Sequence, residues 1–173
     1  MTTYVAFLRA VNVGGTGKLP MTDLKAMCEE LGFGAVKTYI ASGNVVLTSD
    51  EPTSVVKAML EASLEKYAGR SLPVFVRTSE ELLAVVEGNP FPSENPSKSV
   101  AIFLDDPPSP DAASNLKGRH DEIVRLGCRE IYAHYPGGTG RSKLRIPAAD
   151  SGTARNMNTI AKMLKLAGEI EDR

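Results

Sequence analysis

Two hydrophobic patterns alternate along the first half of the chain. Short runs rich in apolar and β-branched residues predict strands, and stretches in which apolar residues recur every three or four positions predict helices. The expected strands cover residues 4–11, 36–40, 44–48 and 72–77. The expected helices begin near Met21 and Pro52 and are closed by Gly32 and Gly69. The order of elements in this half is therefore β-α-β-β-α-β.

A third helix and a linker separate this half from the next. Residues 78–81 have the sequence Thr-Ser-Glu-Glu, which has the form of a capping box, and the helix after them stops before Pro90. The stretch 89–98 holds three prolines with serine and asparagine, a composition typical of a linker. We therefore expect a single compact protein with a first unit over residues 1–90 and a second unit over residues 97–173.

The second half repeats much of the same order. We expect a strand at 99–104, a short helix at 111–117, a hairpin of strands at 122–126 and 129–134, and a last helix at 152–167. The closing strand is missing from the pattern, so either residues 144–146 supply it or the two halves share strands. The sequence therefore predicts an α+β protein of two ferredoxin-like units with antiparallel sheets, in a duplicated or strand-sharing arrangement.

Composition narrows the class of protein further. The chain has 173 residues, of which 42% are hydrophobic and 24% charged, which suits a packed protein and not a disordered one. Its net charge of −1 excludes a generic polyanion-binding protein. No apolar run approaches the ~20 residues that span a bilayer, and the first residues form neither a signal nor a transit peptide. We expect a soluble cytoplasmic protein without a membrane partner.

Cysteine and histidine are too few and too scattered for a metal site. Cys28 falls on the apolar side of an expected helix, and Cys128 follows a glycine in an expected turn. No CxxC pair occurs, and His120 and His134 fit no zinc-binding spacing. We therefore expect no metal and no cofactor.

Two glycine-rich loops are candidate anion sites. The first, after the opening strand, holds Gly14, Gly15 and Lys18, and backbone N–H groups next to a lysine suit an anion. Its spacing fits neither a P-loop nor a dinucleotide fingerprint, so a plain strand-to-helix connection is the alternative. The second loop, residues 137–143, repeats Gly-Gly-Thr-Gly before Arg141. For this loop the alternative is a disordered flap.

Positive charge is concentrated near the end of the chain. Between residues 131 and 168 six basic residues accompany a single acid, Asp150, although the whole chain is nearly neutral. Residues 151–153 are expected to start the last helix, and the N–H groups of a helix N-terminus suit a phosphate or carboxylate. One face of this helix is expected to be basic and the other to lie in the core. The expected core face comprises Met157, Ile160, Ala161, Leu164 and Ala167.

Five ordered motifs carry a resemblance to a known family. They are residues 7–15, 38–46, 74–78 followed by 89–91, 135–136 followed by 140–144, and 152–159. Together they resemble the uncharacterised bacterial family known as domain of unknown function 1697, over essentially the whole chain. One departure is Met157, where such relatives are expected to carry an aromatic, usually Trp, which puts a stacking role there in doubt. The resemblance implies a duplicated ferredoxin-like fold and no established activity.

These features predict a binding module for a phosphorylated or anionic ligand, either a nucleotide or a single-stranded nucleic acid. The expected stacking residues are Tyr39, Phe75 and Tyr135. The expected anion-binding residues are Arg9, Asn12, Gly14, Gly15, Lys18, Gly140, Arg141, Ser142, Lys143, Thr153, Arg155 and Asn156. Two alternatives stay open: a small-metabolite enzyme that uses His134 or Ser142, and a structural or homo-oligomeric protein without a ligand.

Overall fold

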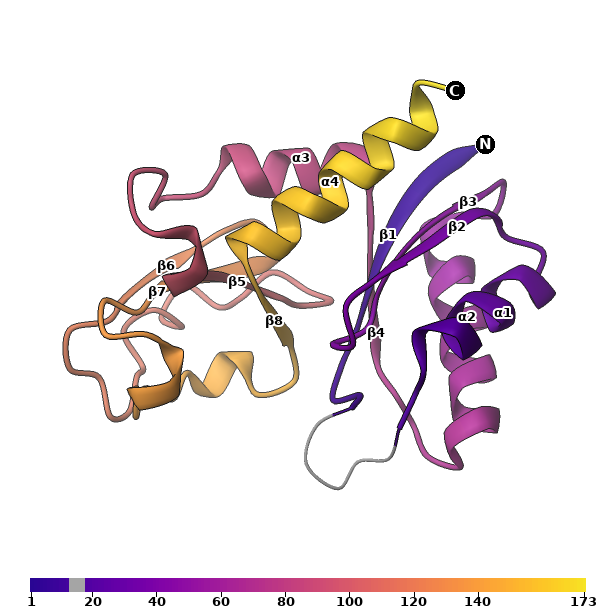
Figure 1. The fold of residues 1–173 in the computed structure, drawn as a ribbon. Helices are drawn as coiled ribbons and strands as arrows, with labels where there is room; N and C mark the ends of the chain where they lie inside the picture. The colour runs from indigo at the N-terminus through magenta and orange to yellow at the C-terminus, as the bar shows by residue number, and fades with distance from the viewer. Residues whose placement is uncertain (13–17) are drawn as a thin grey trace. The chain divides into compact units, whose positions relative to one another are not determined.

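The computed structural model describes residues 1–12 and 18–173. The chain forms two compact units (Figure 1), the first made of residues 1–83 together with 162–173 and the second of residues 84–161. Residues 89–98 hold turns and a short 3-10 helix, and the predicted division of the chain at a linker there stays a prediction.

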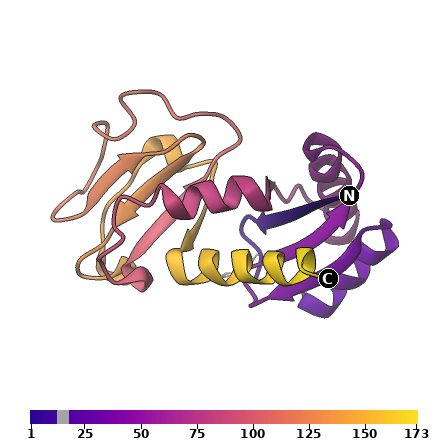
Figure 2. The same cartoon turned by 90° about the horizontal axis from the view of Figure 1, so that it is seen from above.

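The first unit is a ferredoxin-like fold, as the sequence predicted. Its elements are β1 (Thr2–Leu8), α1 (Met21–Glu30), β2 (Gly34–Tyr39), β3 (Asn44–Ser49), α2 (Thr53–Ala68) and β4 (Val74–Thr78). The sheet has the order β2-β3-β1-β4, and every neighbouring pair is antiparallel. Both helices lie on one face of this sheet (Figures 1 and 2).

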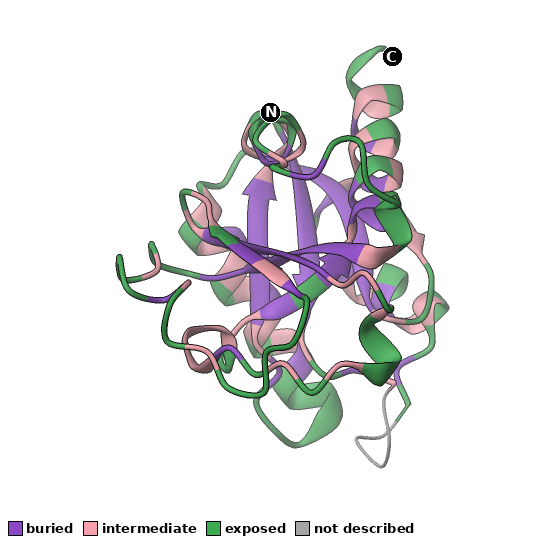
Figure 3. Cartoon of the chain, turned by 90° about the vertical axis from the view of Figure 1, so that its left-hand side faces the viewer, coloured by how far each residue is buried: buried purple, intermediate pink, exposed green. Residues whose placement is uncertain are grey.

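Alternation along the central strand β1 explains why this sheet packs against two helices. Tyr4, Ala6 and Leu8 lie in a core that also contains Leu24 of α1 and Leu60 of α2. Burying a leucine of this kind stabilises the fold by about 1.5–3 kcal/mol. The strands are accordingly the buried part of the molecule, and the loops are mostly exposed (Figure 3).

The second unit contains a sheet of the same strand order. Its strands are β5 (Ser99–Phe103), β6 (Ile123–Leu126), β7 (Glu130–His134) and β8 (Thr153–Asn156). They pair antiparallel in the order β6-β7-β5-β8, so each sheet places its second, third, first and fourth strands side by side in that order. Loop residues such as Ala112 and Ile146 complete the core on one face of this sheet. The predicted duplication is therefore confirmed, and among the described residues the two sheets are separate and share no strand.

The prediction of a short helix at residues 111–117 is wrong. These residues form turns that end in a single bridge between Lys117 and Arg145. Local side chains compete for hydrogen bonds here, since Ser109 Oγ donates to the carboxylate of Asp111 at 2.7 Å. So short a segment, preceded by three prolines, gains too few helical hydrogen bonds to offset the cost of helix nucleation.

The last helix starts later than expected because a strand precedes it. α4 (Met157–Glu171) begins at Met157 instead of Gly152. β8 supplies the closing strand, for which the sequence had left open residues 144–146 or a strand shared between the halves. Pairing with β8, for example of Ile102 with Ala154, satisfies backbone groups along the edge of β5. This gain outweighs the local preference of four residues for a helix.

α3 (Ser79–Glu87) begins with the predicted capping box. Thr78 Oγ1 accepts a hydrogen bond from the N–H of Glu81 at 3.1 Å, and the Glu81 carboxylate accepts one from the N–H of Thr78 at 2.9 Å. This reciprocal pair fixes the helix start directly after β4.

The two cysteines and the apolarity of the helices were also the subject of predictions. Cys28 is buried in the first unit, as predicted, and Cys128 is exposed in the turn between β6 and β7. In the part of the chain that the structure describes, no helix combines the length and the apolarity needed to cross a bilayer. The cytoplasmic location stays a prediction.

Candidate functional site

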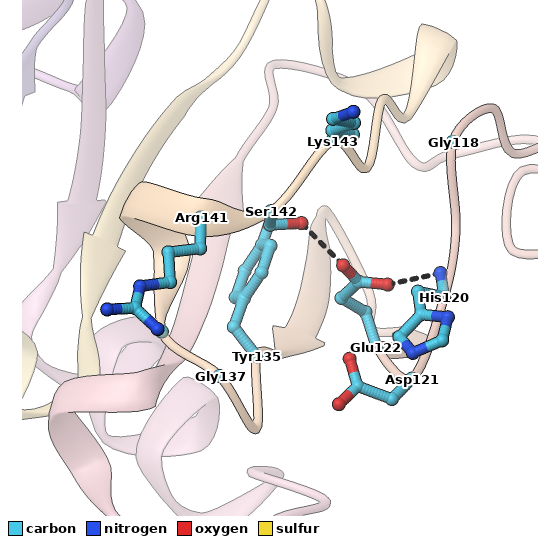
Figure 4. A pocket seen from close by; sticks show the side chains of 10 residues that line it. Gly118, His120, Asp121, Glu122, Tyr135, Gly137, Arg141, Ser142 and Lys143 are labelled. Atoms are coloured by element: carbon cyan, nitrogen blue, oxygen red, sulfur yellow. Dashed lines mark hydrogen bonds between the residues drawn. The ribbon is translucent and has the colours of Figure 1, made fainter.

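A cavity of about 310 Å³ opens in the second unit, at one end of the β6–β7 hairpin. Because Ile123 pairs with His134, the residues just before β6 and just after β7 emerge side by side. Residues 118–122 form one wall, and residues 135–143 form the other (Figure 4). The lining residues are Gly118, His120, Asp121, Glu122, Tyr135, Gly137, Gly138, Arg141, Ser142 and Lys143.

The two walls are held together by their backbones. Lys117 and Arg145 exchange two hydrogen bonds, of 2.9 Å from the N–H of Lys117 and 2.8 Å from the N–H of Arg145. Gly118 follows with φ of 65°, and a Cβ added there would lie 2.2 Å from the carbonyl oxygen of Lys143. Only glycine fits this left-handed position against a neighbouring backbone.

Glu122 is the buried acid of the cavity, with an exposed fraction of 4%. Its carboxylate accepts a hydrogen bond from Ser142 Oγ at 2.6 Å and another from the N–H of His120 at 2.7 Å. These hydrogen bonds, that of Ser142 first, lower the pKa of Glu122 to about 2. The carboxylate is therefore ionised at neutral pH, and it fastens one wall of the cavity to the other.

Two cations of the second glycine-rich segment line the same cavity. Arg141 and Lys143 are both exposed, and neither side chain makes a hydrogen bond or ion pair with any residue that the structure describes. Tyr135 lies between Arg141 and the acidic wall in Figure 4. Burial, together with the charge of Glu122, raises the pKa of Tyr135, so its phenol is protonated at neutral pH.

The structure therefore brings together part of the predicted site. Arg141, Ser142, Lys143 and Tyr135 line the cavity, and Gly140 lies in the 3-10 helix Thr139–Arg141 beside it.

The predicted residues of β8 have structural partners. Arg155 is 7% exposed, and its Nη1 donates to Thr153 Oγ1 at 2.7 Å and to the carbonyl oxygen of Ala154 at 2.9 Å. Burial lowers the pKa of Arg155 to about 10. Asn156 caps α4, because its Oδ1 accepts from the N–H of Thr159 at 2.9 Å. The basic helix start that the sequence predicted is therefore corrected to a strand with Thr153 and Arg155 buried, followed by an asparagine cap.

The predicted residues of the first loop belong to the other unit. The side-chain amide of Asn12 donates to the carbonyl oxygens of Leu19 (2.8 Å) and Ala41 (2.7 Å), and its Oδ1 accepts from the N–H of Leu19 (2.6 Å). Asn12 therefore joins backbone segments, with its own backbone in the left-handed region at φ of 54°. Arg9 directly follows β1, and the predictions for Gly14 and Gly15 fall outside the described residues.

Lys18 lines a second, smaller cavity. This cavity has a volume of about 220 Å³ and combines Lys18, Arg70 and Tyr67 with apolar side chains. Tyr67 Oη donates to the Asp23 carboxylate at 2.8 Å, and Arg70 Nη2 donates to the carbonyl oxygen of Ala10 at 3.3 Å. Lys18 is the first described residue after residue 12.

The other two stacking candidates differ from Tyr135. Phe75 is 2% exposed, and Lys57 Nζ lies 5.3 Å from the centre of its ring. Tyr39 is half-buried, with Lys162 Nζ 5.9 Å from its ring. Tyr135 is the expected stacking residue that lines the 310 Å³ cavity.

His134 and Ser142, the candidate residues of an enzyme, both have hydrogen-bond partners within the second unit. His134 is 5% exposed; its Nδ1 lies 2.9 Å from Ser99 Oγ and its Nε2 lies 3.5 Å from the Glu94 carboxylate. Ser99 is itself 1% exposed, so both groups of this pair are buried and bonded to each other in the second unit. Ser142 donates to Glu122, whose low pKa makes it a weak base for activating a hydroxyl.

Sequence reasoning missed Gly118, His120, Asp121 and Glu122. The first three precede the predicted hairpin and Glu122 is its first residue, and the second glycine-rich segment follows the hairpin. Because a hairpin returns the chain to its starting point, this order was a usable signal that the two segments meet.

The fold and the site together define a duplicated ferredoxin-like α+β protein with a small charged cavity in its second unit. The model of a family described as "Protein of unknown function (DUF1697)" matches residues 1–132, and the chain belongs to this family. The match includes one wall of the cavity, residues 118–122, and ends before the other.

A solved structure has the same fold. The conserved bacterial protein SP0830 from Streptococcus pneumoniae is similar with a TM-score of 0.79 and 24% sequence identity, over 96% of this chain and 98% of that chain. At this identity the likeness concerns the fold alone. None of the curated proteins compared with the chain matches it.

Proposed function

We propose that the protein binds a small phosphorylated or similarly anionic ligand in the cavity of the second unit. The observation that carries this proposal is the pair Arg141 and Lys143, which line the cavity and have no partner among the described residues. A guanidinium group offers a planar fork of donors that matches the oxygens of a phosphate, and an ammonium group adds a second charge. Tyr135 supplies an aromatic wall for the rest of the ligand.

A small ligand is favoured over a single-stranded nucleic acid. A polymer needs a row of cations along its backbone. Here Arg155 is buried and Arg145 is paired with Asp150 at 2.9 Å, so the basic stretch of the sequence does not form such a row. The cavity volume of about 310 Å³ lies at the lower end of the ~300–1,000 Å³ typical of small-molecule sites.

The proposal is tested by isothermal titration calorimetry with AMP and with adenosine, which differ in the phosphate group. We expect AMP to bind and adenosine to bind far more weakly. In the variant Arg141→Gln, we expect the affinity for AMP to fall about tenfold or more, because a charge-assisted hydrogen bond is lost.

Lys165→Gln is the matched control, because it removes one exposed positive charge outside the cavity lining. Its affinity for AMP is expected to stay within about twofold of the wild type, because Lys165 does not line the cavity and salt screens charges that make no direct contact with a ligand. Equal binding of AMP and adenosine, or equal effects of the two substitutions, would contradict the proposal.

A further inference from the structure

The lining of the cavity carries charges of both signs. Figure 4 shows Arg141 on one side of the Tyr135 ring and the carboxylates of Asp121 and Glu122 on the other side. Lys143 also lines the cavity and is drawn on the same side of the ring as the two carboxylates, and the charges of the two cations and the two carboxylates cancel. A site adapted to a bare polyanion would carry an excess of positive charge.

The acidic side of the cavity accepts hydrogen bonds. An ionised carboxylate has about four lone-pair sites and no donor. Glu122 stays ionised and uses part of this capacity for Ser142 and for the N–H of His120. The carboxylate of Asp121 is exposed and makes no hydrogen bond or ion pair with the described residues. This side therefore suits a ligand group that donates hydrogen bonds, such as a hydroxyl.

We infer that the ligand is a phosphate monoester of a polyhydroxylated group, a sugar phosphate or nucleoside monophosphate, with its phosphate at Arg141 and its hydroxyls at Asp121 and Glu122. The inference rests on the proposed function and adds the class of ligand to it. A carboxylate that accepts from the hydroxyls of a ribose is a common way for proteins to recognise nucleotides. Tyr135, between the two charged sides, packs against the ring of the sugar.

The same arrangement disfavours a longer phosphate chain. A diphosphate or triphosphate would extend negative charge from Arg141 toward the two carboxylates. Like charges at short range in a partly buried site repel strongly. Pyrophosphate is therefore expected to bind more weakly than a monoester with hydroxyls, although it carries more charge.

The test compares methyl phosphate, ribose 5-phosphate and pyrophosphate by calorimetry on the intact protein. Methyl phosphate has the anion without hydroxyls, and ribose 5-phosphate has both. We expect ribose 5-phosphate to bind about tenfold tighter than methyl phosphate, because each hydrogen bond to a charged group is worth about that much. Pyrophosphate is expected to bind more weakly than ribose 5-phosphate.

The variant Asp121→Ala separates the roles of the two sides. It is expected to bind ribose 5-phosphate several-fold more weakly while binding methyl phosphate as well as or better than the wild type, since a repelling charge is gone. Asp106→Ala is the matched control, because Asp106 is an exposed acid of the second unit outside the cavity. It should leave both affinities unchanged.

The outcomes distinguish the two proposals. Equal affinities for methyl phosphate and ribose 5-phosphate would overturn the ligand class and leave anion binding intact. A preference for ribose 5-phosphate that survives Asp121→Ala unchanged would also overturn it, because the carboxylate would then not be its source. If none of the three phosphate compounds binds, the proposed function itself is wrong.

Discussion

Two glycines of the cavity differ in what their backbones require. Gly118 has a positive φ and lies against the carbonyl oxygen of Lys143, so a methyl group has no room there. Gly137 has no atom within 4 Å of the position that a Cβ would take. One glycine is therefore needed for the approach of the two walls, and the other is not.

The substitution Gly118→Ala is expected to lower the free energy of unfolding by about 1–3 kcal/mol, because it adds a clash and an unfavourable φ. Gly137→Ala is the matched control and is expected to change the free energy by less than about 1 kcal/mol in either direction. Urea unfolding monitored by circular dichroism measures both. Equal stability of the two variants would show that the walls do not approach as described.

Among the elements, β8 and α4 show how tertiary pairing shifts a boundary. The segment 153–156 was expected to be helical, yet it pairs with β5, and Asn156 then caps the helix. The core face of α4 differs as well, since Ala161 is exposed and Met163 is buried. The helical period was correct, but its orientation depends on what the helix packs against.

The position of the helix start is tested by Asn156→Ala, which is expected to lower the free energy of unfolding by about 1 kcal/mol through loss of the cap. Asn158→Ala, one exposed position inside α4, is expected to be neutral or slightly stabilising, because alanine is the better helix former. Chemical denaturation of both variants gives the comparison. Similar effects at the two positions would place both inside the helix and contradict the cap.

For the whole molecule, the two cysteines report different environments. Cys28 lies in the core of the first unit, and burial, with a smaller effect of Glu29, raises the pKa of its thiol to about 12. Cys128 is exposed in the second unit. The thiolate is the reactive form, so Cys28 is both inaccessible and unreactive in the folded protein.

Labelling with a thiol reagent at neutral pH is therefore expected to modify one cysteine in the native protein and two in concentrated guanidinium chloride. Cys128→Ser should abolish the fast phase and leave Cys28 to react only as the first unit unfolds. Mass spectrometry of the labelled protein counts the modified sites. Rapid native labelling of Cys28 would show that its core is not closed.

The sequence by itself determined the local elements and much of one wall of the site. Strands, most helices and the capping box follow from short-range periodicity and hydrogen-bonding preference, which depend on neighbours along the chain. Arg141, Ser142 and Lys143 were predicted from a glycine-rich segment that contains basic residues, and Tyr135 was predicted as an aromatic stacking residue.

Only the tertiary structure decided which segments meet. The partner of the free edge of β5, the burial of Arg155 and the carboxylates of Asp121 and Glu122 opposite Arg141 all depend on residues far apart in sequence. Unsatisfied backbone groups and buried charges must find partners wherever the folded chain supplies them, and no local pattern encodes where that is.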